Sequence, residues 1–512
     1  MSTVPSIPWS SDLRHLANRF GDRVAVNTGA ATLTYQALSR LAHGLASRLH
    51  SEGIESGTPV ATYLPNGLQA VWASYGVCMM GAAETPLATA YTPTELEWCL
   101  ALAKTAWVVT HERHRALFED IGCRVIAVES VTPAADAYAL DPVPAELWGR
   151  IVFSSGSTGR PKAIIYTHGR RWLANLMLKA TLPFSPAVGS RILLMTPFTH
   201  GAALQTYAWL DHGGEVLLLN GIDRAQVESF LASSSVDAVF APPTVIAKLA
   251  SLFPDRRFDG VRALFTGTQT LTPGLYAKAR ALVGPVVRVT YGKGENLNPI
   301  TVLEAADTEV YYRDESETAG ACLGWPASGV ELAIRDETGR DVSPGETGEI
   351  CIRSRHMSIG HIDAAGFHAM TTMNWHASGD LGWIDQRGRL WLAGRMADVI
   401  KTGGYKVYVQ ELESLLSGVP GCTQIAIATL PSDYWGEIIV AAAEGTGGTP
   451  DWQRAADERL AVIAKHKRPR DYIALDELPR NAQGKISRPA IREAILARYA
   501  LEDGPYPKLT AK

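Results

Sequence analysis

The sequence is poor in cysteine, and its cysteines form no short paired motif. Six cysteines occur in 512 residues, at positions 78, 99, 123, 322, 351 and 422, and no Cys-x-x-Cys is present. Zinc sites and disulfide frameworks built on closely spaced cysteines are therefore excluded. We expect reduced thiols that act as small apolar side chains, as in a cytoplasmic protein.

Long apolar runs and a strong net charge are also missing. The longest uncharged apolar stretch, 70–83, ends at Glu84 and is too short to cross a bilayer. A net charge of -4 gives no general signature of nucleic-acid binding. The first residues, MSTVPSIPWSSDL, contain neither a basic region nor a continuous apolar core, so no secretory signal is expected. We expect a monomer or homodimer with no membrane span and no nucleic-acid partner.

Helical and strand patterns alternate along most of the chain, which is too long for a single core. Leucines recur at helical spacing in 35–50, a second helix is expected near 94–104, and runs such as RILLMTPF and EVLLLN end in turns. After residue 320, shorter strands and Gly/Asp turns predict antiparallel hairpins. The pattern indicates an α/β fold: layered α/β sheets plus a small β-barrel-like subdomain in 1–395, and a small mobile α+β domain in 396–512. The last residues, EDGPYPKLTAK, are expected to form a loose tail.

The segment 151–169, IVFSSGSTGRPKAIIYTHG, has the composition of a phosphate-binding loop between two strands. It is not a Walker loop, because Pro161 precedes Lys162 and β-branched residues follow where a helix would be required. Lys162 can add a charge, and a solvent-exposed Ser/Gly turn rarely needs so many hydroxyls. Backbone N–H groups or hydroxyls could reach phosphate oxygens from Ser154, Ser155, Gly156, Ser157, Thr158 and Gly159.

The stretch SSGSTGRPKAI resembles the signature loop of the adenylate-forming superfamily, which includes acyl-CoA synthetases, luciferases and nonribosomal adenylation domains. Further stretches are similar to motifs of that superfamily in the same order: TLTYQALSRLAHGLASRL, YGKGE (291–295), SGDLGWIDQRGRLWLAGRMADVIKTGGYKV (378–407) and LPRNAQGKISR (478–488). The chain resembles acyl-CoA ligases most. The resemblance implies an AMP-forming acid–thiol ligase that uses ATP, Mg²⁺ and coenzyme A.

The resemblance also implies roles for individual residues. Asp380 would accept hydrogen bonds from the ribose hydroxyls of ATP or AMP, with an ordinary turn aspartate as the alternative. Glu295 would ligate Mg²⁺, and Arg395 would contact ribose or phosphate. Lys485 would bridge the substrate carboxylate and the α-phosphate, with a solvated surface lysine as the alternative. The other nucleotide and coenzyme A contacts implied are Tyr291, Gly292, Thr268 and Gln269 around adenine, and Gly403, Gly404 and Tyr405 along the pantetheine tunnel.

Three positions depart from the pattern of the superfamily. The usual Thr of the YGKGE motif is Gly294, the usual Gly-Gly-Ala-Pro reads Gly-Thr-Gln-Thr at 267–270, and the hinge position is Ala397. One interpretation is neutral drift. The other is a weakened adenylation step, which would leave an enzyme specialised for thioester formation on a supplied acyl-adenylate; one lost hydrogen bond to a charged group, at about 1.5–3 kcal/mol, does not decide between them.

The acyl pocket is expected between 198–205, 266–270 and 290–293. FTHGAALQ (198–205) contains no acid that could hold an α-ammonium group, which argues against an amino-acid substrate. Small residues at 201–203 favour a neutral, medium or bulky apolar acid. We expect His200 to gate the acyl channel or simply to pack, and Lys293 to meet a polar substrate group or to point to solvent.

Three other functions remain open: a luciferase-type oxygenase, a ligase that loads a carrier protein, and a non-catalytic nucleotide-binding module. The pair of histidines in HERH (111–114) suggests zinc, but it has no further ligand pattern and is more typical of a solvated helix face.

Overall fold

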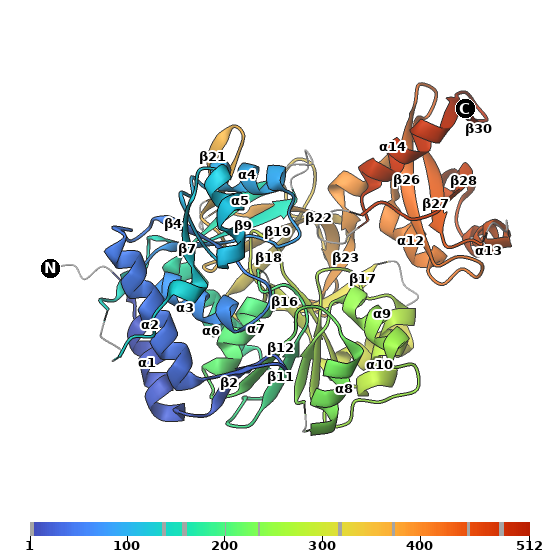
Figure 1. The fold of residues 1–512 in the computed structure, drawn as a ribbon. Coiled ribbons are helices and arrows are strands. Elements are labelled where there is room, and N and C mark those ends of the chain that lie inside the picture. The colour runs from blue at the N-terminus through green and yellow to red at the C-terminus, as the bar shows by residue number, and fades with distance from the viewer. Residues whose placement is uncertain are drawn as a thin grey trace.

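The computed structural model describes residues 5–135, 140–155, 161–199, 201–233, 236–315, 320–370, 374–447, 451–480 and 486–512, with only the backbone described at Ser155, Ser233 and Lys406. Two large sheets with their helices form one part of the molecule, and a smaller C-terminal part stands beside them (Figure 1).

The first large sheet has eight strands and is parallel on one side and antiparallel on the other. Its order is β21 (Gly366–Ala369), β20 (Gly360–Asp363), β10 (Pro161–Thr167), β9 (Trp148–Ser155), β5 (Ala83–Pro86), β4 (Pro59–Tyr63), β6 (Trp107–Thr110) and β7 (Arg124–Ala127). Strands β9 and β10 are the two strands predicted on either side of the hydroxyl-rich loop, and they pair antiparallel.

The second large sheet has thirteen strands, with a parallel centre that ends in antiparallel strands. Its order is β18 (Val330–Arg335), β19 (Gly348–Ser354), β22 (His376–Ile384), β23 (Leu390–Arg395), β17 (Ala321–Pro326), β16 (Thr301–Leu303), β15 (Val287–Tyr291), β14 (Ala263–Thr266), β13 (Ala238–Phe240), β11 (Arg191–Leu194), β12 (Glu215–Leu218), β2 (Val24–Asn27) and β3 (Thr32–Thr34). The strands expected as a barrel-like subdomain are the first five in this order. They belong to the large sheet, because β17 pairs with β23 on one side and with β16 on the other.

Helices cover these sheets because their apolar faces and the sheet faces are buried together. They are α1 (Trp9–Phe20), α2 (Tyr35–Ser51), α3 (Leu68–Met79), α4 (Pro93–Leu102), α5 (Arg115–Asp120), α6 (His168–Ala180), α7 (Gly201–Leu210), α8 (Arg224–Ser233), α9 (Pro243–Leu252), α10 (Pro273–Val283) and α11 (Ala305–Val310). Gly76 of α3 shows how closely α2 packs, since a Cβ there would lie 2.9 Å from the Ala42 carbonyl oxygen. The predicted helices near 35–50 and 94–104 correspond to α2 and α4.

A buried charge cluster ties the first sheet to two helices. Arg150 of β9 and Arg171 of α6 place guanidinium nitrogens 2.6 and 2.9 Å from the same carboxylate oxygen of Glu84 on β5. Arg150 also donates to the Thr199 carbonyl at 3.0 Å, just before α7. Burial opposes ionisation, but the two guanidinium groups together hold the pKa of Glu84 below its usual value.

The C-terminal part contains its own sheet and core. Strands β25 (Tyr405–Tyr408), β24 (Val399–Thr402), β27 (Gly436–Glu444) and β26 (Gln424–Ser432) pair in that order, and β28 (Asp471–Leu475) pairs with β27. Helices α12 (Val409–Leu416), α13 (Asp451–Leu460) and α14 (Arg488–Arg498) pack on it. The prediction of a loose tail is wrong, because β29 (Tyr499–Glu502) pairs with β30 (Lys508–Ala511) and Leu509 is buried in this core.

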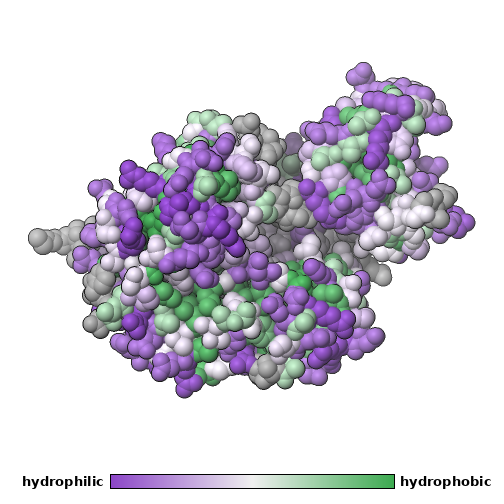
Figure 2. Space-filling model, in the orientation of Figure 1, coloured by the Kyte–Doolittle hydropathy of each residue, from purple (hydrophilic) through white to green (hydrophobic). Residues whose placement is uncertain are grey.

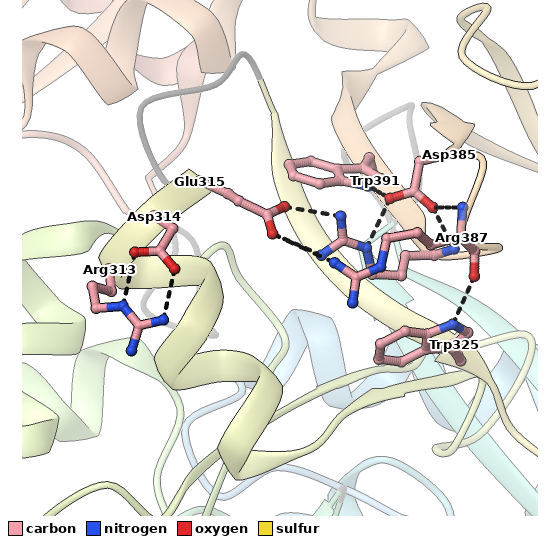
Figure 3. Close-up of polar contacts among 8 residues, drawn as sticks. Arg313, Asp314, Glu315, Trp325, Asp385, Arg387 and Trp391 are labelled. Carbon is pink, nitrogen blue, oxygen red and sulfur yellow. Dashed lines mark hydrogen bonds and ion pairs between the residues drawn. The ribbon is translucent and has the colours of Figure 1, made fainter.

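The β22–β23 hairpin is fixed by a polar network at its turn (Figure 3). Arg389 donates to Asp385 at 2.7 Å and to Glu315 at 2.8 Å, while Trp391 donates to Asp385 at 2.9 Å. Glu315 ends η3 (Tyr311–Glu315), so this network links the hairpin to the α11 region. The hairpin matters because it carries Asp380 and Arg395.

In the orientation of Figure 1, most of the visible surface of both parts is hydrophilic. Hydrophobic residues are concentrated over the lower middle of the large part (Figure 2). Within the described ranges, no helix is both long and apolar enough to cross a bilayer. A short antiparallel pair, β1 (Ser6–Ile7) with β8 (Val143–Pro144), lies outside the large sheets. The 3-10 turn η4 (Met396–Asp398) connects β23 to β24.

Candidate active site

Several predicted motifs meet at one edge of the second sheet. Strands β11, β13, β14 and β15 run parallel, and the segments 195–199, 267–270 and 292–295 follow the carboxyl ends of β11, β14 and β15. Loops at that edge of a parallel sheet are the usual place for ligand binding. The topology therefore gathers segments that lie far apart in the sequence.

The phosphate-loop candidate enters from β9 and leaves along β10. Ser154 pairs with Lys162 across the two strands, and Trp98 donates to the Pro161 carbonyl at 2.9 Å. The Ser154 hydroxyl oxygen is buried and has no partner among the described residues. Of the predicted loop residues, Gly156, Ser157, Thr158 and Gly159 lie outside the described ranges, and only the backbone of Ser155 is described.

Glu295 and Lys162 form a close ion pair. The Lys162 Nζ lies 2.5 Å from the Glu295 Oε1, and Glu295 is buried. Burial raises the pKa of Glu295, but the charges of Lys162 and Lys293 lower it by more. The pKa of this carboxyl is therefore below its usual value. An ionised carboxylate beside hydroxyl-bearing strands is a donor set that suits Mg²⁺ together with phosphate oxygens.

Asp380 is the centre of a polar cluster that sequence analysis did not foresee. Its Oδ2 accepts from the Tyr291 hydroxyl at 2.5 Å and from the Lys293 Nζ at 2.8 Å. Lys293 also donates to the Ser378 carbonyl at 2.6 Å. Arg395, the cross-strand partner of Asp380, places Nε 3.5 Å from Oδ1 and is largely exposed. Lys293 thus does not point to solvent, one of its two predicted positions, but donates to Asp380. Its contact with a polar substrate group stays a prediction.

Gly294 sits where a side chain would collide with the strand beside the phosphate loop. A Cβ at this position would lie 2.6 Å from the Ile164 Cδ1. The Gly294 carbonyl accepts from the Tyr166 hydroxyl at 2.6 Å, which anchors the motif to β10. The space of the missing side chain is therefore filled by Ile164.

The altered segment 267–270 has an unusual backbone. Thr268 has φ of 68°, a conformation that suits glycine and strains a β-branched residue. Gly267 packs so closely that a Cβ would lie 2.3 Å from the Thr290 carbonyl oxygen. Thr268 and Gln269 are exposed, and Thr270 accepts from the Gln410 side chain of α12. This segment is therefore a contact between the large part and the C-terminal part.

The small residues 201–203 do not open space for an acyl group in the way that we expected from the sequence. A Cβ at Gly201 would lie 2.8 Å from the Phe240 Cζ, and Ala202 and Ala203 are buried in the main core. Phe240 takes the space beside Gly201, so the size argument based on these three residues is wrong.

Two predicted catalytic residues, His200 and Lys485, lie outside the described ranges. Gly403 and Gly404 form the turn between β24 and β25 with positive φ angles of 56° and 83°. Tyr405 stacks on His466, with ring centroids 4.0 Å apart. The contacts of this predicted tunnel loop lie within the C-terminal part. Gly292 packs closely against Asn298, since a Cβ added at Gly292 would lie 3.0 Å from the Asn298 Cβ.

A pocket of about 350 Å³ opens beside Lys162 and Glu295. Its other walls include His361, His368 and His376. The His376 Nε2 is buried with no partner among the described residues, and burial lowers the pKa of this histidine. The sequence analysis missed these histidines, although two of them alternate with apolar residues in the GHID and GFHA strands.

The fold and these gathered motifs are those of an adenylate-forming enzyme with a small C-terminal α+β domain. The family described as "AMP-binding enzyme" matches residues 13–361. The chain belongs to this family, and relatives that match it over most of its length are named as acyl-CoA ligases.

Relatives match nearly the whole length of the chain. An acyl-CoA ligase of Bacillus subtilis is 27% identical over 483 residues, covering 92% of this chain and 95% of its own. A salicylyl-CoA synthase/salicylate adenylyltransferase of Streptomyces is 28% identical, covering 95% of this chain and 94% of its own.

A solved structure shows the same fold. The O-succinylbenzoate coenzyme A synthetase of Bacillus subtilis, in complex with ATP and magnesium ion, matches with a TM-score of 0.81 and 22% identity, over 94% of this chain and 98% of its own. The same enzyme with its acyl-adenylate intermediate gives a TM-score of 0.82. This similarity confirms the predicted fold class.

Proposed function

We propose that this chain is an ATP-dependent acyl-CoA ligase that activates a neutral carboxylic acid of medium or large apolar size. The observation that carries the proposal is the Asp380 cluster beside the Lys162–Glu295 pair. The first supplies acceptors for two ribose hydroxyls, and the second supplies charge for a polyphosphate. Because the argument from the small residues 201–203 fails, the proposed size rests on relatives named for salicylate, ferulate and long-chain fatty acids.

In the first step a substrate carboxylate oxygen attacks the α-phosphorus of ATP, and the bond to pyrophosphate breaks. Mg²⁺ held with Glu295 would neutralise the phosphate charge. Asp380 holds the ribose through Oδ1, while Lys162 and the 154–159 segment hold phosphate oxygens. Lys485 stabilises the charge that develops between the carboxylate and the α-phosphate.

In the second step the sulfur of coenzyme A attacks the acyl carbon of the acyl-adenylate. The carbon–oxygen bond to AMP breaks, and the thiol proton passes to water. Asp380 and Arg395 contact AMP until it dissociates. The turn at 403–405 would line the channel for the pantetheine arm after the 396–512 domain reorients about residues 394–398.

The alternative is an enzyme limited to the thioester half-reaction. The observation that bears on it is Gly294, where Ile164 fills the space of the usual hydroxyl side chain. Because Ile164 occupies this space, Gly294 fits its surroundings and is not a gap in the site. We therefore favour the complete reaction.

The test is to incubate the full chain with ATP, Mg²⁺, coenzyme A and acids from acetate to polycyclic carboxylates. Acyl-CoA, AMP and pyrophosphate are measured by mass spectrometry and a coupled assay. We expect all three products with one class of acid. Asp380→Asn should raise the KM for ATP about 10- to 100-fold, because it loses charge-assisted bonds to ribose.

The matched control is Asp336→Asn, which changes an exposed turn aspartate that binds the amide nitrogens of Thr338 and Arg340. It should leave the KM unchanged. Thioester formation from supplied acyl-adenylates, without any pyrophosphate from ATP, would replace the proposal by the half-reaction alternative. Equal kinetics for the two Asp variants would contradict the role of Asp380.

A further inference from the structure

The β20–β21 hairpin presents three potential metal ligands on one face. His361 and His368 are direct cross-strand partners, so their side chains point to the same side. Asp363 lies two residues after His361 on β20 and shares that side. The imidazole rings stack with centroids 4.8 Å apart and an interplanar angle of 17°. One hairpin therefore brings two imidazoles and a carboxylate together.

The ligand atoms are close to the spacing that a bound ion requires. One atom from each of His361, Asp363 and His368 lies within 4.8 Å of the others. The His368 Nε2 is 2.9 Å from the Asp363 Oδ1, and the His361 Nε2 is 3.9 Å from the Asp363 Oδ2. A tetrahedral zinc ion about 2.0–2.1 Å from each ligand would separate them by about 3.3 Å, so small side-chain rotations suffice.

We propose that His361, Asp363 and His368 form a binding site for a borderline divalent transition-metal ion, with zinc as the ion of reference. Two imidazoles and one carboxylate are the donor set of zinc sites that keep a fourth position open. Imidazole nitrogen selects zinc, cobalt, nickel or copper over magnesium, which takes oxygen ligands. This site differs in ligands and in chemistry from the magnesium role of Glu295.

The hairpin also places the site beside the phosphate-loop strand. His361 pairs with Ile164 on β10, and Lys162 lies two residues before Ile164 on the same face. His361 and His368 line the 350 Å³ pocket together with Lys162 and Glu295. Lys162 is paired with Glu295 at 2.5 Å, which reduces its repulsion of a bound cation. The metal site is thus continuous with the candidate active-site pocket.

The experiment titrates zinc into metal-free full-length protein against a chromogenic chelator and counts bound ions by native mass spectrometry. We expect one equivalent per chain that excess Mg²⁺ does not displace. His361→Ala and His368→Ala should each weaken binding at least about tenfold. Asp363→Asn, which keeps an amide acceptor for the hairpin, should also weaken zinc binding. It replaces either alanine variant in the test if circular dichroism shows that the alanine variant does not fold.

Two variants serve as matched controls. His376→Ala changes a histidine of the same pocket outside the cluster, and His114→Ala changes the HERH segment. Both should bind zinc as the wild type does. The proposal is overturned if the wild type binds no stoichiometric zinc, if the three ligand variants bind it equally well, or if the loss occurs in His376→Ala or His114→Ala instead.

Discussion

At the scale of single residues, the two oxygens of Asp380 have different environments. Oδ2 already accepts from Tyr291 and Lys293, while the only described polar neighbour of Oδ1 is Arg395 at 3.5 Å. A carboxylate oxygen has two lone pairs, so Oδ1 retains capacity for ribose hydroxyls. Lys293 therefore holds the Asp380 carboxylate in place through Oδ2 and does not compete with the ribose hydroxyls for Oδ1.

We expect Lys293→Met to raise the KM for ATP at least about tenfold, because Asp380 loses a charge-assisted hydrogen bond worth about 1.5–3 kcal/mol. Lys293→Arg should recover part of the loss. Steady-state kinetics with saturating acid measure this. Lys248→Met, an exposed lysine on α9, is the control. An unchanged KM in Lys293→Met would show that Tyr291 alone positions Asp380.

At the scale of secondary structure elements, His168 joins three segments at the start of α6. Its Nδ1 accepts from the Trp9 indole of α1 at 3.1 Å, and its Nε2 lies 3.1 Å from the Gly81 carbonyl after α3. The neutral ring with a proton on Nε2 satisfies both contacts, whereas a proton on Nδ1 would face the indole N–H. Burial, with the nearby Arg171 charge, lowers the pKa of His168 to about 4.

This lowered pKa makes stability depend on pH. Between about pH 6.5 and 4 the unfolded chain binds a proton at His168 that the folded protein does not, so stability falls as pH falls through that window. The expected loss between pH 7 and 5 is about 2 kcal/mol. Urea unfolding followed by tryptophan fluorescence should show a smaller pH effect in His168→Gln. Identical pH dependence in both proteins would exclude His168 as the source.

At the scale of the whole molecule, the C-terminal part has its own sheet and cores, and it meets the large part through few elements. The side chain of Gln410 on α12 bonds Thr270, next to the strained Thr268. Arg488 of α14 lies 3.2 Å from Asp398 at the connection between the two parts. Figure 1 shows that the C-terminal part otherwise projects away from the large sheets.

A covalent bridge across this contact should arrest the reaction. We expect Thr270→Cys/Gln410→Cys, joined by a short thiol cross-linker, to lose at least about 90% of overall acyl-CoA formation, because domain closure and reopening gate such reactions. Cleaving the linker should restore the rate. Each single cysteine variant, treated identically, is the control. Full activity while cross-linked would mean that both half-reactions proceed in the arrangement described here.

Much of this protein can be predicted from local sequence. The hydroxyl-rich loop between β9 and β10, the alternation of strands and helices and the adenylate-forming motifs are all visible there, because a strand, a helix or a backbone loop depends on neighbouring residues. The predictions that are wrong are those that depend on residues far away in the sequence. Local sequence predicts a loose tail because Gly and two prolines hide the pairing of β29 with β30. It predicts open space at Gly201 because Phe240 lies 39 residues away.

Only the tertiary structure decided which side chains meet. Lys293 reaches Asp380 and Tyr166 binds Gly294 because the order of the strands places them together, and Phe240 covers Gly201 because α7 packs beside β13. The histidine pair of β20 and β21 lies beside Lys162 for the same reason. A shift of one residue in register would move strand side chains such as Asp380, Tyr166 and Phe240 to the opposite face of their sheets. The sequence by itself determined the family and its motifs, and the packing of the sheets determined the partners within the site.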